Sequence, residues 1–207
     1  MAQDGSASLS VSMSLQPGMA ALIQRLNAAG DRTNTPTLNG PSIAASMTGA
    51  PGIRSVTFRN TSQTAIEGQA NISQIGDFLS ASRRGFITFN RGQQGGSCVI
   101  NINRENSVLI IEALSDEIAD YLNALMAPIA TGEEMTKQEY LELVSSFYNR
   151  TISNEISASR ILLSIDFPGN ITRAAAGTFS GRRAVFNIPL LDLLVLETPL
   201  VYEVIWN

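Results

Sequence analysis

Apolar and small polar residues alternate near both ends of the chain. Residues 9–15 alternate leucine, valine and methionine with serine, and residues 161–167 and Leu200–Trp206 repeat the alternation with larger apolar side chains. A period of two is typical of antiparallel strands that bury one face. Because both ends of the chain show this period, we predict that the first and last strands belong to the same sheet.

Shorter segments between these ends also predict β-structure. Alternating or β-branched stretches predict strands at residues 53–59, 66–72, 86–90, 98–103 and 184–188. The glycine-rich segment 92–96 predicts a hairpin between two of them. The strongly apolar segment 189–196 predicts a short helical turn before the last strand.

Apolar residues at helical spacing predict the α-structure. One helix follows residue 18, a short one capped by Ser42 runs to residue 47, and two main helices span residues 115–126 and 136–147. Thr136 and Glu139 form the sequence pattern of a capping box.

Helices inserted between antiparallel strands predict an α+β fold. We expect a mostly antiparallel sheet of about six to eight strands, with the two main helices packed on one face. The sequence shows no linker, so we predict a single domain over residues 1–207 with a flexible N-terminal tether at residues 1–6.

The charges are few and unevenly placed. The net charge is -4 and Lys137 is the only lysine, which argues against a nucleic-acid partner. Acidic residues dominate between residues 115 and 142, whereas arginines dominate between residues 53 and 104. This second group is either a solvated surface or a surface for anionic head groups, and it comprises Arg54, Arg59, Arg83, Arg84, Arg91 and Arg104.

The sequence offers little for catalysis. The chain has no histidine, which removes the commonest general base and the commonest metal ligand. Cys98 lies in a predicted strand, where a small core residue is the main interpretation and a reactive thiol the alternative. Asp116, Glu117 and Asp120 stand at a helix start, where acids favour the helix dipole. We therefore predict that the protein is not an enzyme and binds neither a metal nor another cofactor.

Small residues in the predicted strands suggest room for a ligand. Gly68, Ala70 and residues 174–177 would leave space on the inner face of a sheet, and the two main helices would cover that space. The hypothesis is an apolar cavity between these helices and the sheet, and the alternative is a fully packed core. The candidate lining residues are Ile118, Tyr121, Leu122, Leu125, Met126, Tyr140, Leu143, Val144 and Phe147.

The C-terminal motifs resemble the LppM-type domain of bacterial envelope lipoproteins. They are the Pro-Gly turn in Ile165–Ile171, the glycine at residue 181 before the apolar strand 184–188, and the ending Tyr202–Trp206. The resemblance implies an exported, lipid-anchored α+β domain with a hydrophobic cavity for lipid or glycolipid. It carries over no catalytic residue, because the motifs are turns and strands.

Two main hypotheses about function remain open. The first is a non-enzymatic cell-envelope lipoprotein domain that binds a lipid or another apolar small molecule and meets the membrane surface through a lipid anchor. The alternative is a structural or protein-interaction module of the envelope whose core is fully packed, although the sequence predicts no particular protein partner. The chain has neither a lipobox cysteine nor a terminal membrane helix, so we expect the native gene to encode an export signal and a lipid-modified cysteine directly before residue 2.

Overall fold

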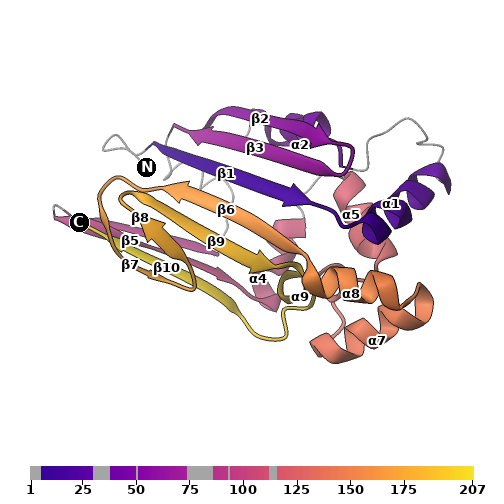
Figure 1. The fold of residues 1–207 in the computed structure, drawn as a ribbon. Helices are drawn as coiled ribbons and strands as arrows, with labels where there is room; N and C mark the ends of the chain where they lie inside the picture. The colour runs from indigo at the N-terminus through magenta and orange to yellow at the C-terminus, as the bar shows by residue number, and fades with distance from the viewer. Residues whose placement is uncertain (1–5, 30–37, 50, 74–85, 93, 112–115) are drawn as a thin grey trace.

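Two β-sheets and a group of helices make up the computed structural model. It describes residues 6–29, 38–49, 51–73, 86–92, 94–111 and 116–207, apart from the side chains at positions 27, 29, 108–111 and 116–118. The two sheets lie as two layers, and most helices gather at one end of them (Figure 1). The α+β class predicted from the sequence is confirmed.

The larger sheet has six antiparallel strands in the order β2-β3-β1-β6-β9-β8. Its central strand β1 carries the alternation seen in the sequence, with Leu9 among the side chains packed against the core and Ser10 opposite Gln69 of β3 and Ser164 of β6. The bounds are β1 (Ala7–Ser14), β2 (Ile53–Ser62), β3 (Ala65–Ile72), β6 (Arg160–Asp166), β8 (Thr178–Ser180) and β9 (Arg183–Pro189).

The smaller sheet has four antiparallel strands in the order β4-β5-β10-β7. The bounds are β4 (Ile87–Gly92), β5 (Gly95–Ile102), β7 (Ile171–Ala175) and β10 (Leu200–Trp206). The prediction that the first and last strands share a sheet is therefore wrong, because β1 belongs to the six-stranded sheet and β10 to the other. A period of two specifies which face of a strand is buried, but it contains no information about the neighbouring strand.

The two sheets face each other across a core that we call the sandwich core. Aromatic rings fill its centre: Phe89 and Phe167 each lie 5.2 Å from Trp206, and Phe186 meets Tyr202 at 5.1 Å between ring centroids. Cys98 is 3% exposed in this core, and burial raises the pKa of its thiol to about 12. Cys98 is thus a small core residue, as the main interpretation of the sequence held.

The helical part is larger than the sequence predicts. The sequence analysis did not predict helices α4, α6 and α8 or strands β7 and β8. The N-cap of α2 is Asn39 rather than the expected Ser42, whose backbone N–H donates to the Asn39 side chain. The bounds are α1 (Pro17–Ala29), α2 (Gly40–Met47), α4 (Arg104–Ile111), α5 (Asp116–Ala124), α6 (Pro128–Thr131), α7 (Lys137–Phe147), α8 (Arg150–Ala158) and α9 (Leu190–Val195).

Helices α1 and α6 to α9 pack around a second core, which we call the helical core. The predicted capping box at the start of α7 is confirmed: the Thr136 backbone N–H donates to Glu139, and the Glu139 backbone N–H donates to the Thr136 hydroxyl. Glu155 of α8 holds the start of α1, because its carboxylate accepts hydrogen bonds from the backbone N–H groups of Gly18 and Met19 at 2.9 and 2.7 Å.

The two cores are connected through shared neighbours. Ile102, Ile161 and Leu200 pack against both the sandwich core and the helical core. Of the predicted tether at residues 1–6, only Ser6 belongs to the described residues.

Candidate functional site

An apolar cavity lies at the helical end of the molecule, against the inner face of the six-stranded sheet. Met13 of β1, Ile66 of β3 and Ile161 of β6 form its sheet side. These three residues sit at one end of their strands, since Met13 pairs directly with both Ile66 and Ile161. The cavity therefore begins where the sandwich core ends.

Helices from distant parts of the sequence close the other sides. Helix α1 contributes Met19 and Ile23, the segment leading into α2 contributes Leu38, and α2 itself contributes Ile43. Helices α5, α6 and α9 supply further leucine, isoleucine and tyrosine side chains. These remaining contributors, with Leu15 beyond the end of β1, are Tyr121, Leu122, Leu125, Ile129, Leu190, Leu193 and Leu194.

The cavity has the properties of a hydrocarbon site. Its volume is about 220 Å³, and no polar surface faces it. An engineered apolar cavity of roughly 150 Å³ stays dry and binds benzene or xenon, so a site of this size holds a somewhat larger apolar group. It is smaller than the roughly 300–1,000 Å³ of pockets for drug-sized ligands. A whole lipid therefore does not fit inside, whereas one hydrocarbon group of a ligand does.

Three of the nine predicted lining residues do line this cavity: Tyr121, Leu122 and Leu125. Tyr121 and Leu125 are buried, and Leu122 is half-buried. The side chain of Ile118, predicted on the same helix, lies outside the described residues. Helix α5 and the turn after it therefore lie beside a void.

The other five predicted residues lie elsewhere, which corrects the expected position of α7. Tyr140 and Val144 are fully buried in the helical core, where the Tyr140 hydroxyl donates to the Leu125 carbonyl at 3.2 Å. Met126 and Leu143 are half-buried and do not line the cavity, and Phe147 is 69% exposed. Helix α7 packs on α8 and α9 and has its own partners, so it is part of the packed core and not a cavity wall.

The small residues that suggested a cavity serve another purpose. A side chain at Gly68 would collide with the ring of Phe58 on the neighbouring strand, and one at Gly177 would come within 2.6 Å of the ring of Phe186. The space that these glycines leave is filled by aromatic rings from adjacent strands. The void instead lies where strands, α1, α2 and α9 diverge.

Sequence reasoning missed the contributions of α1, α2 and α9 to the cavity. Met19 and Ile23 were visible as an apolar stripe, and the segment 189–196 was visible as strongly apolar. Both signals indicate burial, but neither distinguishes a side chain against a void from one in a filled core.

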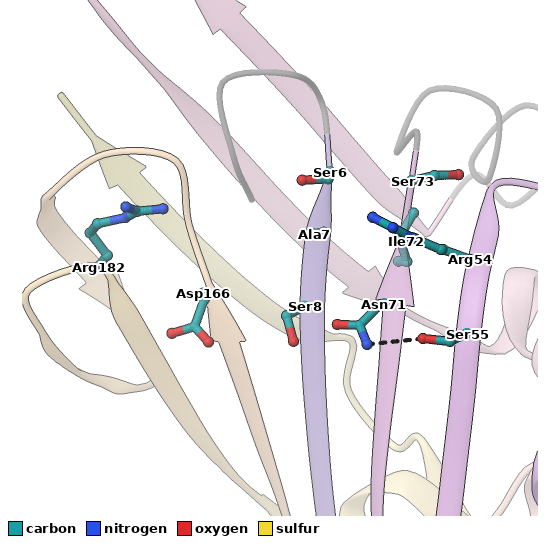
Figure 2. Close-up of a pocket in the computed structure, with 10 residues that line it drawn as sticks. All are labelled: Ser6, Ala7, Ser8, Arg54, Ser55, Asn71, Ile72, Ser73, Asp166 and Arg182. Atoms are coloured by element: carbon teal, nitrogen blue, oxygen red, sulfur yellow. Dashed lines mark hydrogen bonds between the residues drawn. The ribbon is translucent and has the colours of Figure 1, made fainter.

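A second, polar pocket lies on the six-stranded sheet at the end away from the helices (Figure 2). Its volume is about 420 Å³, and hydroxyl and amide groups line much of it. Figure 2 shows Arg54 and Arg182 on opposite sides of the pocket, with Asp166 between Arg182 and strand β1. Arg183 binds the Asp166 carboxylate through two hydrogen bonds of 2.8 and 2.7 Å, which hold the pKa of Asp166 below its usual value.

The polar side chains of this pocket are not arranged to bind one chemical group of a ligand together. The Asp166 carboxylate would repel an anion placed between the two arginines, and the Asn71 amide is already donated to the Ser55 hydroxyl at 3.0 Å. Arg182 also donates through Nε to the Phe167 carbonyl. Several polar groups of the pocket already form hydrogen bonds with other groups of the protein. The apolar cavity is therefore the stronger candidate site.

The arginine-rich segment does not form one surface in the described structure. Arg59 pairs with Glu67 at 2.9 Å on the outer face of the six-stranded sheet. Arg104 instead faces the helical end, where it donates to the carbonyls of Leu196 and Met135 at 3.2 and 3.0 Å. Arg83 and Arg84 lie outside the described residues.

Comparisons and searches for known features add no assignment. No protein-family model, no curated protein and no solved structure matches this chain. Within the described residues, no three histidine, cysteine or acidic side chains gather as a metal site. None of the helices described here is both long and apolar enough to cross a membrane.

Proposed function

We propose that this protein is a non-enzymatic binding domain that holds the hydrocarbon group of a lipid or another apolar ligand in the cavity at its helical end. The observation that carries the proposal is the cavity of about 220 Å³ with no polar surface facing it. Native interiors are packed to nearly crystalline density, and voids larger than a water molecule are few. An apolar void of this size leaves contacts unmade that a bound hydrocarbon would make.

The cavity also determines the chemistry of the ligand. Burial of apolar surface contributes roughly 25 cal/mol per Å² removed from water, whereas a charged or hydrogen-bonding group placed here would lose its hydration without gaining a partner. The ligand must therefore present an uncharged hydrocarbon end to the cavity and keep any polar head group outside. This requirement fits an acyl chain end better than a compact polar metabolite.

The decisive experiment adds benzene and a short series of alkanes to the purified protein and follows methyl NMR signals. Saturable shifts should appear at the methyl groups of Ile66, Leu193 and Leu194, which line the cavity. Native mass spectrometry of protein from its own host then identifies any lipid that co-purifies.

Two matched variants separate the cavity from the surface. Leu193→Phe adds volume at the cavity wall and should weaken benzene uptake. Leu162→Phe makes the same change on the outer face, where Leu162 is 43% exposed, and should leave uptake unchanged. No saturable uptake by the unmodified protein would overturn the proposal and favour the structural or protein-interaction module.

The proposal also includes the cellular location of the protein, which we expect to be the cell envelope. Its support is the resemblance of the C-terminal motifs to the LppM-type domain, because that resemblance implies an exported domain on a lipid anchor. Fractionation of the native host with an antibody against this protein should find it with the envelope. Recovery from the cytosol of a form that begins at Met1 would contradict the envelope location and leave the cavity proposal intact.

A further inference from the structure

Helix α2 is the helical wall of the cavity that is least deeply embedded: among the described residues its only buried residue is Gly40, whereas α1, α5, α6 and α9 each bury apolar side chains. It contributes Ile43 to the lining, and Leu38 precedes it. Its main contacts are with the neighbouring strands β2 and β3 (Figure 1). By contrast, α1 is held by the Glu155 carboxylate, and α9 carries Leu194 and Val195 deep in the helical core.

A single side chain fastens the start of α2 to the sheet. Asn60, near the end of β2, donates through Nδ2 to the Leu38 carbonyl and accepts through Oδ1 from the Gly40 backbone N–H at 3.0 Å. The Gly40 N–H belongs to the first turn of α2, where the helix itself provides no partner. One carboxamide therefore satisfies a donor and an acceptor on either side of the N-cap, Asn39.

Gly40 allows this attachment to be close. A side chain at Gly40 would come within 3.1 Å of backbone atoms of Phe58 and Arg59, so glycine lets the helix start rest directly on β2. The register of β2 against β3 shifts between Asn60 and Ser62. Asn60 precedes this shift and lies on the same face of β2 as Phe58, which packs against the same cluster as Ile43 of α2, so the ordinary alternation of the strand already directs Asn60 towards α2.

We propose that α2 is the movable wall of the cavity and that Asn60 is the positioning residue that keeps it closed. This inference rests on the proposed function, because it describes how the hydrocarbon reaches its site. Lifting α2 breaks the two Asn60 hydrogen bonds and the Gly40 contact. Lifting α1 would instead strip a carboxylate from two backbone N–H groups, and moving α9 would open the helical core.

The variant Asn60→Asp tests this role with a reversible change. A protonated carboxyl group offers one O–H donor and one carbonyl acceptor, as the carboxamide does, and can bind both Leu38 and Gly40. An ionised carboxylate has no donor and faces the Leu38 carbonyl with negative charge. The closed state therefore favours the protonated form and raises the pKa of the new carboxyl group above its usual range.

Few other titratable groups lie near residue 60, so a pH dependence of the Asn60→Asp variant can be assigned to the new carboxyl group. Helix α2 carries no titratable side chain, and the charged residues on β2 and β3 are Arg54, Arg59 and Glu67, of which the last two form an ion pair. The chain has no histidine, and the thiol of Cys98 has a pKa of about 12. The unmodified protein should therefore exchange ligand at a nearly constant rate from pH 5 to 8.

The measurement is the release rate of benzene by NMR exchange spectroscopy from about pH 3 to pH 8, with the unmodified protein measured at every pH, because a fivefold to tenfold effect raises the carboxyl pKa by no more than about one unit. Loss of one hydrogen bond should speed release by about fivefold to tenfold. Asn60→Ala should release benzene faster at every pH, whereas Asn60→Asp should do so at neutral pH and return towards the unmodified rate in acid. Asn71→Asp is the matched control, since it removes a side-chain donor to Ser55 on the same two strands, away from α2.

Each outcome bears on the proposal. Unmodified release rates in both Asn60 variants, or equal acceleration by Asn71→Asp, would overturn the role of Asn60. If the unmodified protein takes up no benzene, the proposed function fails, and amide hydrogen exchange at Gly40 and Ile43 still measures the opening of α2. Unchanged protection of these amides in Asn60→Asp at neutral pH would overturn the inference about α2 as well.

Discussion

The two ends of the six-stranded sheet bury equally apolar side chains but pack them differently. At one end the second sheet supplies aromatic rings, and Trp206 lies between Phe89 and Phe167 at 5.2 Å from each. At the other end helices supply mainly leucine, isoleucine and methionine side chains, and a void of about 220 Å³ remains. The same strands, β1, β3 and β6, run through both environments.

The difference shows that burial and packing are separate properties. Ile165 of β6 is 3% exposed and Ile66 of β3 is 4% exposed, so exposure alone does not distinguish them. Ile165 belongs to the sandwich core, whereas Ile66 lines the cavity. Sheet-on-sheet packing brings two continuous surfaces together, whereas five helices and three connecting segments, which carry Leu15, Leu38 and Leu125, meet the sheet here and leave space between them.

The largest expected effect comes from truncating these two isoleucines. Ile165→Ala should lower the free energy of unfolding by about 3–5 kcal/mol, because a filled core loses contacts on every side. Ile66→Ala should cost about 2–3 kcal/mol, because its cavity side already lacks neighbours. Urea denaturation measures both. Equal losses would show that the cavity region is packed as tightly as the sandwich core.

Substitutions that add volume also separate the two regions: they should destabilise the sandwich core more than the cavity region. Ala184→Leu places extra atoms beside Phe186 in the sandwich core, where Ala184 is fully buried, and should cost about 1–3 kcal/mol. Leu193→Phe adds volume next to the cavity and should change the free energy of unfolding by less than about 1 kcal/mol, because the void accepts the extra atoms. The comparison fails if the cavity substitution is the more damaging of the two.

A smaller effect concerns acid stability at the sandwich end. The hydrogen bonds from Arg183 lower the pKa of Asp166, so the pair stabilises the fold above the carboxyl's usual pKa of about 3.9 and this contribution is lost as pH falls through the lower folded-state value. Solvent screens the pair, since the two side chains are 34% and 58% exposed, so its contribution to stability is small.

Urea titrations of Asp166→Asn from pH 7 to 2 test this assignment. The gap to the unmodified protein should be constant above about pH 5 and should close in acid. Glu139 at the helical end should also stabilise the fold at neutral pH and lose this contribution in acid, because hydrogen bonds from the Thr136 backbone N–H and hydroxyl lower its pKa. A gap that persists at pH 2 would mean that Asp166 acts through packing and not through its charge.

The smallest effect is expected at Phe147. This ring was predicted to line the cavity but is 69% exposed at the end of α7, so Phe147→Ala should change the free energy of unfolding by no more than about 0.5 kcal/mol. It should also leave benzene uptake unaltered. Loss of uptake in this variant would restore α7 as a cavity wall.

Local patterns in the sequence predicted most of the elements and some of their contacts. The last strand was predicted at its observed bounds, and the Thr136–Glu139 capping box forms as expected. These predictions succeeded because strand periodicity and helix capping depend on residues a few positions apart.

What the sequence by itself determined is which face is buried in strands with a clear period of two, such as β1, β6 and β10. Only the tertiary structure decided that β10 joins β5 and β7 and not β1, and that the void lies against α1, α2 and α9 and not against α7. Strand partners and voids depend on the summed shapes of segments far apart in the chain. Gly68 illustrates the reason: its missing side chain predicted space, but the ring of Phe58 from the next strand fills it.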